Sequence, residues 1–294
     1  MIRFADWGMR GELAQIWRTC FDEPARPARY FLNNYFRPEN CLIYQFGGKT
    51  AAVVYLLPAQ VAAGEKTAQA HYIYAAATLP KYRSHGYMAA LLASAALVGA
   101  NRGDQYSVVL PATPELYPLY QKSDYSTFYH IQTVSLSLSE LCDLAESGRI
   151  GKALFTYHQL SSLRNAQLSG RNGSVLWSGE AFAFAAGMGA VYGDRLVCSR
   201  TGDKAAYALC RRMDENTCKV LEVMADSETI RDLAANIISA VPAQMYSFRL
   251  PVGQTLLSGQ GEISDFGMIK PIGGAVMETV QPGSGVPYLG LPLD

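Results

Sequence analysis

The chain has 294 residues, the usual length of two domains that are each large enough to bury a core of their own. Its 25 lysine and arginine side chains are balanced by 25 aspartate and glutamate side chains, which argues against nucleic acid or an anionic membrane as a partner. No run of about 18 apolar residues is unbroken and the first residues lack a signal-peptide pattern, so a cytoplasmic protein without a membrane span is predicted.

Cysteine and histidine usage gives no sign of a disulfide framework or a metal site. The six cysteines are scattered through the sequence without a C-x-x-C pair, which predicts free thiols in a reducing compartment. His85, His130 and His158 lack the spacing of metal ligands, so no metal is expected.

The first elements are two helices followed by an antiparallel meander. Apolar residues at helical spacing predict a helix over residues 10–21, and aromatic residues after two prolines predict another over 28–36. Those aromatic residues either pack a core or shape an acceptor groove. Strands are predicted over residues 41–46, 51–58 and 71–78, with two glycines supplying the first hairpin turn.

The stretch from residue 75 to 93 organises the rest of the first half. Pro80 ends the third strand, and an alanine- and leucine-rich helix is predicted over residues 87–100. Gly86 lies at the join, where the absence of a side chain allows close approach to the backbone. The amides of residues 84–88 are then free donors at the positive end of a helix dipole, a natural seat for a phosphate. A glycine turn that binds nothing is the alternative.

Arg83-Ser84-His85-Gly86-Tyr87-Met88 resembles the acetyl-CoA pyrophosphate loop of the GNAT acetyltransferases, Gln/Arg-x-x-Gly-x-Gly/Ala. Met88 departs from that pattern, because Gly or Ala is usual there. The resemblance implies that acetyl-CoA is held by the end of the strand and by the loop, at Ala76, Ala77, Thr78, Arg83, Ser84, His85, Gly86, Tyr87, Met88 and Ala89. For Arg83, contact with phosphate and simple solvation remain alternatives.

A second motif follows at the family's spacing. After a strand predicted over residues 106–110, the segment from Leu116 to Tyr125 is similar to the family's short helix that ends in Tyr-x-x-x-Gly-Phe. Tyr120 takes the tyrosine position, which implies a general acid for the leaving thiolate; a buried structural tyrosine is the alternative. Asp124 replaces the glycine and tolerates the same left-handed backbone, whereas Thr113 stands where many members have asparagine.

The second half repeats the order of the first. A strand over residues 128–138 is expected to close the first domain, and residues 139–151 form a boundary. A helix is predicted over 152–166, a packed core segment over 175–192, and then a hairpin, strand, helix and strand over 194–212, 220–224, 227–241 and 245–250. Carboxylates of Asp226 and Glu228 stand where the first half has its loop, and they would repel a phosphate.

We therefore predict an α/β (α+β) GNAT fold, a mixed sheet flanked by helices, with a second, degenerate GNAT-like domain. Residues 1–140 form the catalytic GNAT domain, and residues 151–294 form the GNAT-like domain without a cofactor loop. This arrangement looks like the acetyltransferases related to the enhanced-intracellular-survival proteins. In that group the C-terminal carboxylate enters the active site as a base, which here implies Asp294.

The resemblance implies an acetyl-CoA-dependent N-acetyltransferase that acts on a primary amine of a small molecule or peptide. A non-catalytic acyl-CoA-binding sensor is the alternative, and the presence of Tyr120 favours the enzyme. The general base is left open: His71 enters the site region on a strand, but a lone histidine on an apolar strand is more often structural. The acceptor and the oligomeric state, including a homo-oligomer, are also left open.

Overall fold

The computed structural model describes residues 1–259, 261–280 and 285–291. Its helices longer than one turn are α1 (Arg10–Phe21), α2 (Ala25–Asn34), α3 (Tyr87–Asn101), α4 (Tyr117–Gln121), α5 (Leu138–Leu144), α6 (Tyr157–Leu168), α7 (Gly179–Val191) and α8 (Ile230–Ala240). No described helix is both long enough and apolar enough to cross a membrane.

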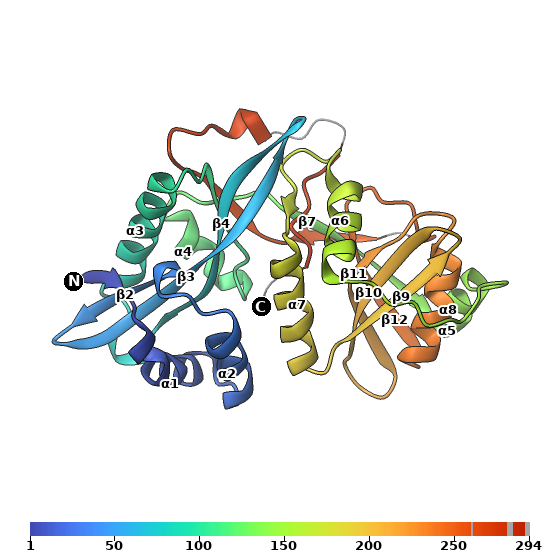
Figure 1. Ribbon diagram of the computed structural model, residues 1–294, viewed down its shortest axis with the longest axis horizontal. Helices are drawn as coiled ribbons and strands as arrows, with labels where there is room; N and C mark the ends of the chain where they lie inside the picture. The colour runs from blue at the N-terminus through green and yellow to red at the C-terminus, as the bar shows by residue number, and fades with distance from the viewer. Residues whose placement is uncertain (260, 281–284, 292–294) are drawn as a thin grey trace.

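The first sheet runs in the order β1-β2-β3-β4-β5-β14-β6, with β8 paired to β3. Its strands are β1 (Ile2–Phe4), β2 (Cys41–Phe46), β3 (Lys49–Ala63), β4 (Lys66–Thr78), β5 (Tyr106–Val109), β6 (Ser126–Thr127), β8 (Val175–Leu176) and β14 (Met268–Pro271). Helix α3 packs on one face of the sheet and α1 and α2 on the other (Figure 1). The hairpin of β3 and β4 extends well beyond the neighbouring strands, and both of its strands are longer than predicted.

The second sheet runs in the order β13-β7-β12-β11-β10-β9. Its strands are β7 (His130–Ser137), β9 (Arg195–Thr201), β10 (Lys204–Arg212), β11 (Thr217–Met224), β12 (Met245–Pro251) and β13 (Glu262–Asp265). Helices α5 and α8 cover one face, while α6 and α7 lie between this sheet and the first one (Figure 1). The predicted fold class is confirmed, since both halves are mixed sheets flanked by helices.

The two sheets exchange strands across the predicted boundary region. The strand predicted to close the first domain is β7, and it pairs with β12 and β13 in the second sheet. In return β14, from the end of the chain, pairs with β5 and β6 in the first sheet. Neither β13 nor β14 was expected, and both pair with strands that lie far earlier in the chain. The domain division at residues 140–151 remains a prediction, and the sheets do not follow it strictly.

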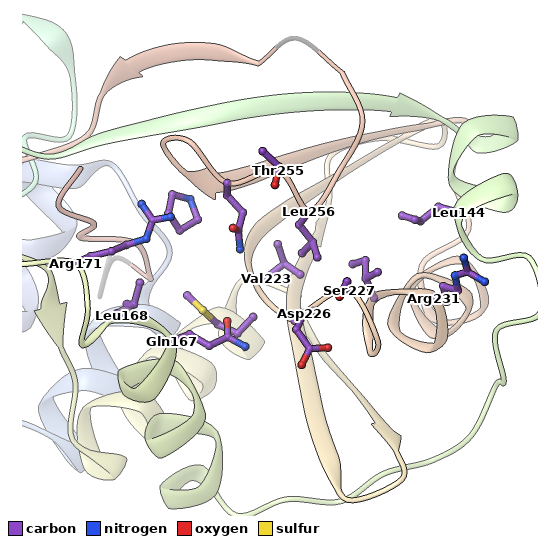
Figure 2. Close-up of a pocket in the computed structure, with 15 residues that line it drawn as sticks. Leu144, Gln167, Leu168, Arg171, Val223, Asp226, Ser227, Arg231, Thr255 and Leu256 are labelled. Carbon is purple, nitrogen blue, oxygen red and sulfur yellow. The ribbon is translucent and has the colours of Figure 1, made fainter. Parts of the chain in front are cut away.

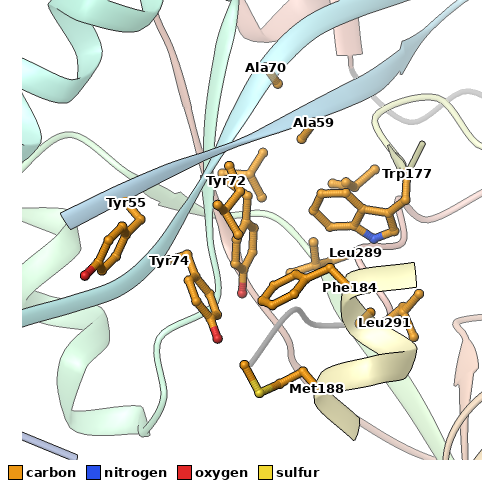
Figure 3. Packing of buried hydrophobic residues seen from close by; sticks show 14 of the residues in the cluster. Tyr55, Ala59, Ala70, Tyr72, Tyr74, Trp177, Phe184, Met188, Leu289 and Leu291 are labelled. Carbon is orange, nitrogen blue, oxygen red and sulfur yellow. The ribbon is translucent and has the colours of Figure 1, made fainter. Parts of the chain in front are cut away.

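Aromatic and aliphatic side chains from both halves form one core between the sheets (Figure 3). Tyr72 of β4 meets Trp177 edge to face, and the rings of Tyr74 and Phe184 meet in the same way. The C-terminal tail, residues 285–291, enters this core with Leu289 and Leu291. A continuous core of this kind fixes the two halves relative to each other.

A buried ion pair lies beside that core. The Arg164 guanidinium and the Glu222 carboxylate are both fully buried, with Nε and Oε1 3.1 Å apart. Arg164 also donates to the carbonyl oxygens of Val175 and Leu289, each at 2.7 Å. One side chain thus ties α6, β8, β11 and the tail together.

Candidate active site

The candidate site begins where β4 and β5 separate. Their parallel pairing runs from Ala70 opposite Tyr106 to Ile73 opposite Val109 and then ends. Ala75 has a left-handed backbone with φ 44°, and the register between β3 and β4 shifts at this point. This bulge turns the end of β4 away from β5, so a gap opens between the two strands.

A cavity of about 190 Å³ fills the gap. It is lined by Trp17, Phe21, Glu23, Ile73, Tyr74, Ala75, Ala76, Val109, Leu110, Ala112, Leu116, Tyr120 and Tyr192. Ile73 and Tyr120 pack with α3, whereas Tyr74 and Trp17 pack on the face that carries α1. The cavity therefore connects the two faces of the sheet, and a molecule on one face can reach a molecule on the other.

The loop before α3 has the geometry that the sequence predicted. Gly86 is left-handed with φ 77° and precedes Tyr87, the first residue of the helix, so the first-turn amides of Tyr87, Met88 and Ala89 have no partner within the helix. A Cβ placed on Gly86 would meet nothing within 4 Å, and the space above the loop is open. No side-chain cap binds these amides in the described residues, so this positive helix end is open to an anionic group.

The other residues predicted for the cofactor surround this loop. Arg83, Ser84, His85 and Ala89 are exposed, and Arg83 Nε donates to the Thr78 carbonyl oxygen at 3.2 Å, so its side chain turns back towards β4. The Tyr87 ring stacks on Tyr44 at 4.1 Å and fixes the start of α3. Ala76 lines the cavity within the bulge, whereas Ala77 and Thr78 pair with β3.

Tyr120 lies on the α3 side of the cavity. Its side chain is 6% exposed, and its ring meets Tyr125 edge to face at 5.7 Å. Asp124 has φ 65°, so the left-handed turn predicted after this helix is confirmed. Because Tyr120 lines the cavity from the face that carries the loop, its hydroxyl can serve a group that reaches the gap from there.

Glu23 lies on the opposite side of the cavity and was missed by the sequence analysis. The indole of Trp17 donates to Glu23 Oε2 at 2.8 Å, and the Tyr192 hydroxyl donates to Glu23 Oε1 at 2.9 Å. Through these two hydrogen bonds the carboxylate links α1 of the first half to the end of α7 of the second half. A lone glutamate before a proline carries no local signal, because its partner Tyr192 is 169 residues away.

Of the two residues considered as the general base, the structure places His71 but does not describe Asp294. His71 is buried under α3: its Nδ1 lies 2.8 Å from Asp104 Oδ2, and a Cβ on Gly99 would come within 2.5 Å of the ring. It is a packing residue and does not line the cavity. Asp294 lies outside the described residues; the tail up to Leu291 is buried near Tyr74 and Met188 (Figure 3). Among the described residues no three His, Cys, Asp or Glu side chains gather as a metal site.

Comparison with known proteins finds a family match in the first half of the chain. Residues 2–128 match the family model of the acetyltransferase (GNAT) domain. The first half is therefore similar to a GNAT domain. No curated protein matches the sequence.

Solved structures extend the likeness in fold to nearly the whole chain. Eis1 from Mycobacterium abscessus matches with a TM-score of 0.67 and 12% identity, over 92% of this chain and 73% of that one. A GCN5-related N-acetyltransferase from Kribbella flavida matches with a TM-score of 0.72 and 16% identity, over 93% of this chain and 71% of that one. A conserved protein of unknown function from Enterococcus faecalis, described as a probable N-acyltransferase, matches with a TM-score of 0.73 and 14% identity. The match covers 93% of this chain and 72% of that one. The fold of the two halves together is therefore shared with these solved structures.

The second sheet has a counterpart of the GNAT cavity. Parallel pairing of β11 with β12 ends at Val220 opposite Phe248, and a cavity of about 620 Å³ lies beyond it, beside the start of α8 (Figure 2). Here Asp226 Oδ1 accepts from the amides of Glu228 and Thr229 at 3.0 and 2.9 Å. A side-chain carboxylate thus binds backbone amides just before α8, where it would repel a phosphate.

Proposed function

We propose that the protein is an acetyl-CoA-dependent N-acetyltransferase that acts on a primary amine. The observation that carries the proposal is the cavity that crosses the sheet between the open α3 loop on one face and Glu23 on the other. Acetyl-CoA would approach from the α3 face with its pyrophosphate on the amides of residues 84–89. The acceptor would approach from the face of α1 and α7.

The reaction needs only groups that this arrangement supplies. The amine nitrogen attacks the thioester carbonyl carbon, the carbon–sulfur bond breaks, and the acetyl group stays on nitrogen. Backbone amides around Ala76 and Ala77, in and beside the bulge, are the candidates for holding the carbonyl oxygen as it gains charge. Tyr120 would protonate the leaving thiolate.

The amine must also lose a proton, and a carboxylate is the group we propose for it. Glu23 is the carboxylate that lines the cavity, and its two neutral donors hold it in place without neutralising it. Asp294 would be the alternative if the end of the chain reaches the same space. Glu23→Gln and removal of the last three residues distinguish the two, because only the change at the true base should abolish turnover.

The test combines calorimetry with a thiol-release assay. Acetyl-CoA should bind once per chain, because the Asp226 carboxylate lies on the amides just before α8 and would repel a phosphate there. Thiol release should then appear with at least one class of amine among polyamines, amino sugars and peptides. Binding at two sites per chain would contradict the account of the second sheet. Binding without any turnover would favour an acyl-CoA sensor.

A further inference from the structure

An aromatic patch lies beside the α3 loop. It consists of Tyr44 and Phe46 at the end of β2, Tyr82 and His85 in the loop, and Tyr87 at the start of α3. The Tyr87 ring is stacked on Tyr44 at 4.1 Å and on His85 at 5.5 Å between ring centroids. Phe46 contacts both Tyr87 and Tyr82, at 5.9 and 6.1 Å. Side chains of the loop and of the β2–β3 hairpin therefore form one surface.

The patch meets solvent although it is built of large rings. Phe46 is 55% exposed and His85 is exposed as well, whereas the three tyrosines of the patch are partly buried. The rings are held by one another, and His85 Nδ1 also lies 2.7 Å from the Arg83 carbonyl oxygen. Exposed rings that keep their positions without a ligand can stack on a planar group at little cost in conformational entropy.

The order of the strands puts the patch and the cavity on opposite sides of the loop. The loop follows β4, the cavity lies between β4 and β5, and β2 lies on the other side of β4, beyond β3. Two strand spacings separate β2 from β4, a distance of about 10 Å. A cofactor with its thioester in the cavity and its pyrophosphate on the loop amides can therefore place its nucleotide end on the patch.

Positive charge accompanies the rings. Residues 44–50 and 79–88 contain two lysines and one arginine, and no aspartate or glutamate. Lys81 Nζ lies over the Tyr82 ring at 4.8 Å, and no carboxylate of the described residues lies within 4.0 Å of it. Glu12 of α1 accepts from a backbone amide of β3 at 3.2 Å. The charge of Lys81 is therefore available to an anionic group next to the patch.

We propose that the aromatic patch binds the adenine ring of acetyl-CoA by stacking, and that Lys81 binds the phosphate on its ribose. This inference rests on the proposed use of acetyl-CoA and assigns the place of its adenosine half. The exposed Phe46 ring is the expected contact for the adenine. Stacking needs only the flat face of the base, and the lysine adds attraction for the ribose phosphate.

Calorimetry with a fragment of the cofactor tests the stacking. S-acetyl-4′-phosphopantetheine has the thioester and one phosphate but no adenosine, and it is compared with acetyl-CoA in each protein. Phe46→Ala should weaken acetyl-CoA binding by about tenfold and leave binding of the fragment unchanged, whereas Phe46→Trp should retain the affinity. Phe4→Ala is the control, because Phe4 is an exposed ring beside Arg102, at the far end of α3.

Two further measurements address the base and the phosphate separately. The fluorescence of 1,N6-etheno-CoA should be quenched by stacking in the wild-type protein and in Phe46→Trp, and the quenching should be lost in Phe46→Ala. Lys81→Gln should weaken binding of acetyl-CoA and leave binding of 3′-dephospho-acetyl-CoA unchanged.

The outcomes separate this inference from the proposed function. An unchanged acetyl-CoA affinity in Phe46→Ala, or an equal loss of affinity for acetyl-CoA and for the fragment, would overturn the inference and leave the cofactor loop standing. A dimer that Phe46→Ala dissociates without a change in acetyl-CoA affinity would assign the patch to a contact between copies of the chain instead. If the wild-type protein does not bind acetyl-CoA, the inference and the proposed function both fail.

Discussion

At the scale of single residues, the candidate chemistry depends on two side chains that line the cavity between β4 and β5 from opposite sides. Tyr120 is packed from the α3 side, and Glu23 is held from the other side by donors from both halves. Each therefore keeps its position without a ligand. Such preorganisation is what a positioned acid or base requires.

Tyr120→Phe keeps the ring and its packing and removes only the hydroxyl. We expect turnover to fall by roughly 10²-fold or more, the usual scale for a general acid, with acetyl-CoA affinity nearly unchanged. Steady-state kinetics and calorimetry measure the two effects. Tyr125→Phe is the matched control, because that hydroxyl is buried against Ser107 Oγ at 2.6 Å and does not line the cavity. Full turnover in Tyr120→Phe would return the residue to a structural role.

The buried pair of Arg164 and Glu222 gives a prediction about stability. Glu222→Gln leaves the fully buried guanidinium without its counter-charge, and we expect a loss of about 3–5 kcal/mol in the free energy of unfolding. Urea denaturation measures it. Lys204→Gln, which breaks only exposed ion pairs with Asp226 and Glu228, should leave the midpoint almost unchanged. Equal losses in the two variants would contradict the importance of the buried pair.

At the scale of elements, the start of α3 combines a positive helix end with an open space above Gly86. The bulge in β4 is the second such element, since it separates the strands that a regular ladder would keep together. The helix start and the bulge can serve one ligand only because β4 leads directly into the loop. The two features therefore lie a few residues apart in the sequence.

Gly86→Glu tests the loop. A side chain would occupy the open space, and its carboxylate would compete for the same amides, so acetyl-CoA binding should fall below the level that calorimetry detects. The control is Gly202→Glu, because Gly202 also has a positive φ and open space but lies in the hairpin of β9 and β10. A folded Gly86→Glu protein with unchanged affinity would remove the loop from the site.

At the scale of the whole molecule, exchange of strands makes the two halves depend on each other. β14 pairs with β5 from Met268 opposite Val109 to Pro271 opposite Tyr106, and it also joins β5 to β6. Without it, the buried strand β5 becomes an edge. Exposed apolar edges of this kind associate with other chains.

Residues 1–140 alone should therefore be insoluble or self-associated, although they contain the whole match to the GNAT family model. Co-expression with residues 141–294 should restore a soluble complex, because the second fragment supplies β14 and accepts β7. Size-exclusion chromatography distinguishes these results. A monomeric fragment 1–140 that unfolds cooperatively would show that β14 is dispensable.

The sequence by itself determined the elements whose signal is local. The periodicity of residues 10–21 gave α1 at its observed bounds, and the residues from Pro80 to Gly86 located the α3 loop, because capping and turn formation depend on near neighbours. Tyr120 followed from the spacing of a family motif, and its place beside the cavity agrees with that motif.

Only the tertiary structure decided the features that join distant parts of the chain. The pairing of β14 with β5, the bond between Tyr192 and Glu23, and the ion pair of Arg211 with Asp194 all join residues from different elements or halves. Such contacts leave no pattern in any short stretch, because their energy comes from groups that become neighbours only after the chain has folded. For that reason the α3 loop and the place of Tyr120 could be proposed from the sequence, whereas Glu23 and its partner Tyr192 could not.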